Sequence, residues 1–149
     1  MFQIHFTEEI EAPKNIVWDV ITDLDDYPSW NKFVVTCRST LAVGSAIDMK
    51  VKLFPFMKIS QNETILANDE GDLLEYGMNM PFGLLYSSRK HILTETGTNY
   101  TNYKSVFVLK GWLSPVVGFL VGSQLRRGFR EMTSGIAERA QGIYAVRNV

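Results

Sequence analysis

The sequence has little cysteine and almost no net charge, and both features narrow the range of functions. Cys37 is the one cysteine among 149 residues, so no disulfide can form within the chain, and a cytoplasmic location is the simplest expectation. Lysine and arginine number 15 against 16 acids, which gives a formal net charge of -1. A domain that binds nucleic acid needs a clear basic surplus, so no nucleic-acid partner is expected.

Long apolar runs and metal-ligand clusters are also missing. The most apolar stretch, Trp112 to Gly122, is too short for a membrane-spanning helix, which needs about 20 residues. The first residues carry acids where a signal peptide would be basic and then apolar. The two histidines, His5 and His91, lie far apart in sequence and outside any metal-ligand spacing. With no glycine-rich phosphate loop either, the sequence predicts no metal and no cofactor.

The hydrophobic pattern predicts strands and helices in a definite order. Phe2, Ile4 and Phe6 alternate with polar residues, which indicates a strand that ends before Pro13. Apolar residues then recur at helical spacing over 13–24, with Pro13 in the tolerated first turn. Short turn signals separate the six further strands that we expect, so that neighbours should pair antiparallel. These strands are residues 32–40, 46–54, 57–67, 72–80, 84–95 and 99–110.

The last segment is predicted to form one long helix. From Pro115 to Tyr144, apolar and small residues recur every three or four positions, which makes a continuous stripe on one helix face. The stripe consists of Gly122, Leu125, Phe129, Met132, Ile136, Ala140 and Ile143. Glycines within this helix indicate close packing, a helix that can bend, or tolerated surface positions. Helices segregated to one side of an antiparallel sheet make an α+β domain.

Two segments of the sequence carry a family resemblance: "IEAPKNIVWDVITDLDDYPSWNKFV" (10–34) and "GTNYTNYKSVFVLKGWLSP" (97–115). They resemble the START-like (SRPBCC) superfamily, and within it the polyketide cyclase/dehydrase and lipid-transport branch. The resemblance implies a helix-grip fold with residues 1–149 as a single domain. In that fold a curved antiparallel sheet of about six to seven strands wraps around the long C-terminal helix, with short helices after the first strand.

An acidic cluster, Asp23, Asp25 and Asp26, raises the question of a metal site. The spacing lacks the further oxygen ligands, the glycine and the distal glutamate of a calcium loop. We therefore expect Asp23 to close the first helix and Asp25 or Asp26 to cap a second short helix, with no metal bound.

The predicted function is to bind or carry a hydrophobic small molecule in a cavity between the sheet and the long helix. Lipids, polyketides, isoprenoids and aromatic compounds are the candidate ligands that the resemblance implies. Alternation and helical spacing give the predicted lining, which is apolar with few polar groups, as in most ligand cavities. It consists of Met49, Val51, Tyr76, Met78, His91, Tyr103, Phe107, Phe119 and Phe129.

Two other functions remain open. A polyketide cyclase or dehydratase would use the same pocket, with His91 as acid or base and Arg89 or Tyr103 as its partner. Relatives often carry a cavity-facing acid where this chain has Phe107, and the loss of that acid counts against catalysis. An interaction module with a filled cavity is the third function.

Two predicted turns contain large apolar side chains, which is unusual for turns. Phe54 and Phe56 stand at one hairpin tip and Phe82 in another turn. They form a ligand gate, make transient membrane contact, or fold back on the core. The sequence carries no signal for the oligomeric state.

Overall fold

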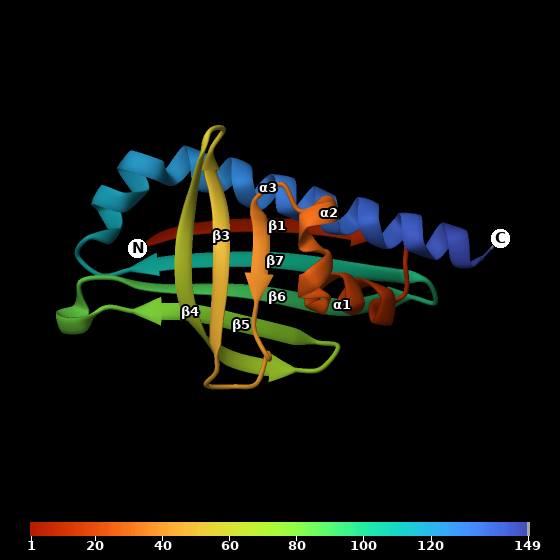
Figure 1. The fold of residues 1–149 in the computed structure, drawn as a ribbon. Coiled ribbons are helices and arrows are strands. Elements are labelled where there is room, and N and C mark those ends of the chain that lie inside the picture. The colour runs from red at the N-terminus through yellow and green to blue at the C-terminus, as the bar shows by residue number, and fades with distance from the viewer. Residues whose placement is uncertain (149) are drawn as a thin grey trace.

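The seven strands form one antiparallel sheet in the order β1-β7-β6-β5-β4-β3-β2 (Figure 1). The structure is a computed structural model and describes residues 1–148. Every strand expected from the sequence is present, and the α+β helix-grip fold is confirmed. The strands are β1 (Phe2–Ile10), β2 (Val34–Arg38), β3 (Ala46–Phe54), β4 (Met57–Asp69), β5 (Leu73–Asn79), β6 (Tyr86–Gly97) and β7 (Tyr100–Lys110).

The sheet is strongly curved, and β3 and β4 run steeply across the direction of β6 and β7 (Figure 1). The pairing register shifts within β2–β3, β3–β4, β4–β5 and β6–β7, and such bulges bend strands and increase their twist. β4 pairs with β5 only from Thr64 onward. The first half of β4 is therefore paired with β3 alone, and this half bounds the cavity described below.

The C-terminal helix α3 (Ser114–Arg147) packs on the concave side of the sheet. The predicted stripe is largely confirmed, because Phe129, Met132, Ile136 and Ala140 are buried. The helix extends slightly beyond the predicted 115–144 at both ends. No helix within residues 1–148 is long and apolar enough to cross a membrane.

Most of the glycines in α3 are sites of close packing. A Cβ atom on Gly128 would lie 2.2 Å from the ring of Phe33. Gly118 and Gly122 pack against Phe2, and Gly135 packs against Trp30. Gly142 has open space around it, so the surface alternative holds only there.

Three short helices follow β1: α1 (Lys14–Thr22), η1 (Leu24–Asp26) and α2 (Tyr27–Trp30). Asp23 stands at the C-terminal end of α1, as expected. The predicted capping of the second helix is wrong, because Asp26 makes no side-chain cap hydrogen bond. Instead, Asp26 forms an ion pair of 2.9 Å with Arg139 of α3 and accepts a hydrogen bond from Ser29. The acidic stretch therefore fastens the short helices to α3.

Candidate ligand-binding site

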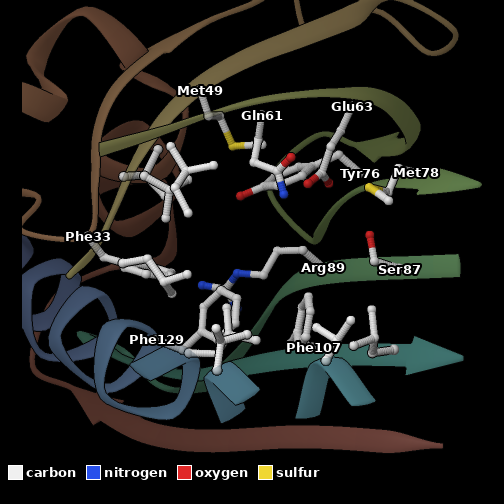
Figure 2. A pocket seen from close by; sticks show the side chains of 18 of the residues that line it. Phe33, Met49, Gln61, Glu63, Tyr76, Met78, Ser87, Arg89, Phe107 and Phe129 are labelled. Carbon is white, nitrogen blue, oxygen red and sulfur yellow. The ribbon is translucent and has the colours of Figure 1, made fainter. Parts of the chain in front are cut away.

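A cavity of about 170 Å³ lies between the sheet and the first half of α3. Its walls come from all strands except β1, and from α3, and Figure 2 shows side chains that line it. The lining residues are Phe33, Val34, Met49, Val51, Leu53, Ile59, Gln61, Glu63, Tyr76, Met78, Leu85, Ser87, Arg89, Phe107, Leu109, Val117, Val121, Leu125 and Phe129. Most of them are apolar, as the sequence predicts.

Alternation along the strands explains most of this lining. Met49, Val51 and Leu53 stand at every second position of β3 and point inward, while Phe107 and Leu109 do the same on β7. On β3 the alternating polar residues Asp48, Lys50 and Lys52 are exposed to solvent.

Four polar side chains interrupt the apolar wall: Gln61 and Glu63 of β4, and Ser87 and Arg89 of β6. In Figure 2 the ends of Gln61 and Glu63 point into the cavity from the wall opposite Phe107 and Phe129. Burial raises the pKa of Glu63 to about 7, although the positive charge of Arg89 lowers it. Glu63 is therefore divided between its neutral and ionised forms near neutral pH.

Arg89 brings a permanent positive charge into the cavity, with only 3% of its surface exposed. Nη1 donates to the hydroxyl oxygen of Ser105. Nη2 makes two long contacts, 3.5 Å to Tyr103 Oη and 3.6 Å to the sulfur of Met132. The guanidinium carbon lies 4.5 Å from the centre of the Phe129 ring, a cation–π arrangement. All of these partners are neutral.

His91 lies in the core beside the cavity wall and is fully buried. Its Nδ1 is 2.6 Å from Tyr103 Oη, and its Nε2 is 3.1 Å from Tyr76 Oη. Burial holds the pKa of His91 well below its ordinary value, and the nearby charge of Arg89 lowers it further. The imidazole is therefore neutral, with both ring nitrogens engaged by tyrosine hydroxyls.

The structure brings six of the nine predicted lining residues together at the cavity: Met49, Val51, Tyr76, Met78, Phe107 and Phe129. His91 and Tyr103 are on the predicted face but in the packed core below it. Phe119 is 89% exposed, on the far side of α3 from the cavity. Contact of any of these residues with a ligand stays a prediction.

Sequence reasoning missed Gln61 and Glu63. The signal was present, because Ile59, Gln61, Glu63 and Ile65 occupy alternate positions of β4 and so share one face. The apolar Ile59 and Ile65 at the two ends of this series mark the face as the inner one.

An exposed apolar patch lies where β7 leads into α3. We call it the apolar end, and it consists of Phe82, Trp112, Val116, Phe119 and Leu120. Trp112 Nε1 donates a hydrogen bond to the carbonyl oxygen of Phe82 at 3.3 Å, which joins the turn η2 (Pro81–Gly83) to the start of α3. Phe82 and Trp112 are 90% and 72% exposed.

The two predicted hairpin-tip phenylalanines are placed differently. Phe56 is 93% exposed at the β3–β4 tip, whereas Phe54 is partly buried against the core. Phe56 and Phe82 therefore do not fold back on the core, and Phe54 does.

Three solved structures resemble this fold closely. A protein from Thermus thermophilus has a TM-score of 0.72 at 15% identity, over 95% of this chain and 99% of that one. Norcoclaurine synthase from Thalictrum flavum, in complex with dopamine and hydroxybenzaldehyde, has a TM-score of 0.68 at 16% identity, over 92% and 84%. A START superfamily protein from Mycobacterium smegmatis has 0.67 at 14%, over 96% and 97%. These identities establish a shared fold and not a shared ligand.

The family of this protein is shown by its sequence. The family model described as polyketide cyclase / dehydrase and lipid transport matches residues 1–141. The chain belongs to this family, and the resemblance drawn from its two segments is confirmed. No curated protein matches the sequence.

Proposed function

We propose that this protein binds and carries an apolar small molecule in the cavity between the sheet and α3. The observation that carries the proposal is the cavity itself, whose wall is apolar apart from four polar side chains. Ligand cavities commonly have this composition, in which the apolar area gives affinity and a few polar groups give orientation. An unfilled cavity also counts against the interaction-module alternative.

The arrangement around His91 supports binding rather than catalysis. A general acid or base must reach the substrate from a ring nitrogen, but both nitrogens of His91 are occupied by Tyr76 and Tyr103. The imidazole is also buried beneath the cavity wall. These contacts favour a structural histidine over the acid or base that the cyclase alternative assigns to His91.

Binding of an uncharged fluorescent probe, N-phenylnaphthylamine, tests the proposal. The wild-type protein should bind it and shift its emission to the blue. Val121→Phe adds bulk to the cavity wall and should weaken binding at least about tenfold. Val146→Phe, at an exposed position near the end of α3, is the matched control and should leave binding unchanged. An absence of wild-type binding, or equal binding by both variants, would overturn the proposal.

We also propose that the apolar end contacts an anionic lipid surface transiently. Segments 76–94 and 99–130, which contain the apolar end, have no acidic residue, while they include Lys110, Arg126 and Arg127. Exposed aromatic side chains among basic residues suit the interface of an anionic membrane. Val117 and Val121 line the cavity from the same helical turns, so membrane contact would lie beside the ligand.

Sedimentation with lipid vesicles tests this contact. The wild type should sediment with vesicles that contain phosphatidylglycerol and less with phosphatidylcholine alone. The double variant Phe119→Ser, Leu120→Ser should lose the association, whereas Val146→Ser should keep it. The proposal would be overturned if the wild type is a dimer and the double variant is a monomer. That result would mean that a second copy of the chain covers the apolar end.

A further inference from the structure

Arg89 is a buried charge that forms no ion pair within residues 1–148. The one acid among the lining residues, Glu63, faces the cavity from β4 and makes no ion pair with it. Arg89 is 3% exposed, and its guanidinium touches hydroxyl groups, a thioether and an aromatic ring, none of which is negative. Transfer of an ion from water into such surroundings is costly unless another charge compensates it. Within residues 1–148 the ion pairs are Lys14–Asp72 and Arg139–Asp26, and Arg89 takes part in neither.

The hydrogen bonds of Arg89 are also incomplete. Its Nε is buried and has no hydrogen-bond partner among the described residues. The contacts of Nη2, at 3.5 Å and 3.6 Å, are long. Guanidinium groups bind carboxylates through two parallel N–H donors, and Nε with a neighbouring Nη forms such an edge. Figure 2 shows Arg89 extending along the cavity wall toward Phe129.

We propose that the ligand is an apolar carboxylic acid, bound as its carboxylate, and that Arg89 is its counter-ion. This inference rests on the proposed function of the cavity. The wall around Arg89 accommodates an apolar body, and Arg89 is the only permanent cation among the lining residues. A phosphate ester would bring up to two charges and more acceptors than this single edge can satisfy.

The volume of the cavity limits the size of the apolar body. About 170 Å³ is close to the ~150 Å³ of an engineered cavity that holds benzene, and below the ~300 Å³ at which drug-sized sites begin. An acid with one aromatic ring or a short alkyl chain therefore fits the cavity as it stands.

Three compounds with the same apolar body test the proposal: phenylbutyrate, phenylbutanol and phenylbutylamine. Calorimetry at neutral pH should show the carboxylate binding about tenfold or more tighter than the alcohol, as expected for a charge-assisted bidentate pair. The amine should bind more weakly than the alcohol, because its charge repels Arg89.

Two arginine variants make the test specific. Arg89→Met keeps an apolar stem but removes the charge, so the carboxylate should lose its advantage while the alcohol changes by less than about threefold. Arg38→Met removes an exposed arginine of β2 and should leave all three affinities unchanged. Arg89→Lys keeps the positive charge but lacks the two parallel N–H donors of the guanidinium. Its preference for the carboxylate should lie between those of the wild type and Arg89→Met.

The outcomes separate this inference from the proposed function. Equal wild-type affinity for carboxylate and alcohol overturns the inference but leaves the carrier function standing. A carboxylate preference that survives Arg89→Met overturns it as well. Binding of neither compound, nor of the uncharged probe, overturns the carrier function itself. The wild-type ranking decides the inference even where Arg89→Met does not fold.

Discussion

Arg89 and Phe107 are directly paired across β6 and β7, and both line the cavity. Directly paired residues in an antiparallel sheet lie on one face with their Cβ atoms about 5 Å apart. An acidic side chain at position 107 would therefore stand beside the guanidinium as an internal counter-ion. The chain has an aromatic ring there instead, which leaves the charge of Arg89 available.

Phe107→Glu should abolish the preference for a carboxylate ligand. The new carboxylate would pair with Arg89, so phenylbutyrate should bind at least about tenfold more weakly, while phenylbutanol should lose only the contact with the ring. Calorimetry on the same compounds measures the change. Phe107→Gln, of similar shape but uncharged, should retain the preference; loss of the preference in this control would show that the ring, and not the charge balance, sets it.

Binding of a carboxylate should weaken as pH rises through about 7, the pKa to which burial raises Glu63. Below that pH Glu63 is neutral, whereas above it a negative charge faces the ligand from β4. Arg89 stays charged throughout, and the neutral His91 and Tyr76 keep their protonation states. We expect a loss of about fivefold in phenylbutyrate affinity between about pH 6 and pH 8.

Glu63→Gln is the control for this pH dependence. The amide keeps the shape of the side chain but does not ionise, so the affinity should stay level across the same range. A pH dependence that persists in Glu63→Gln would assign it to another group.

The neutral state of His91 should make the protein less stable in acid. Its pKa is lowered by burial in the folded state, so the unfolded chain takes up a proton first, and the free energy of unfolding falls as pH drops below about 6.5. The slope should be at most about 1.4 kcal/mol per pH unit. Glu63, with its raised pKa, acts in the opposite direction over part of this range.

Urea denaturation of Glu63→Gln isolates the effect of His91. In this variant the free energy of unfolding should fall more steeply between about pH 7 and pH 5.5 than in the wild type. The double variant Glu63→Gln, His91→Gln should be nearly level. An equal slope in the single and double variants would mean that His91 is charged in the folded protein.

Two glycines of α3 should respond to alanine in opposite ways. Gly128→Ala places a methyl group 2.2 Å from the ring of Phe33, and the displacement of that ring should destabilise the protein by about 1–3 kcal/mol. Gly142→Ala meets nothing within 4 Å and should stabilise it by about 0.5–1 kcal/mol through helix propensity. Thermal unfolding measures both, and destabilisation by Gly142→Ala would contradict the open space around that residue.

The sequence predicted the fold well because each element has its own local period. Alternation in 46–54 and the stripe from Leu125 to Ile136 are strong signals. The strand formed over the predicted residues, and the helix extends slightly beyond its predicted ends. Alternation also identifies the inner face of a strand, which is why Met49 and Phe107 were predicted to line the cavity and do so.

Alternation shows which residues lie on the inner face of a strand. It does not show which of them border the cavity and which lie in the packed core. Arg89 and His91 share the inner face of β6, but one lines the cavity and the other is enclosed by Tyr76 and Tyr103. Position in the curved sheet separates them, and that curvature depends on long-range pairing. The prediction for Phe119 was wrong because Val117 and Val121 line the cavity, and a residue two positions from each of them lies on the opposite face of α3.

β1 is an edge strand whose sole neighbour in the sheet is β7. Phe2 pairs with Leu109, and Ile10 pairs with Thr101, so β1 leaves the ribosome before its partner strand, which is made about a hundred residues later. At about 5–20 residues per second, the delay is roughly 5–20 s. Glu8 and Glu9 lie in this strand, and charges on an open edge hinder pairing between chains. We expect fragments stalled before residue 100 to be the form of this protein most prone to aggregation.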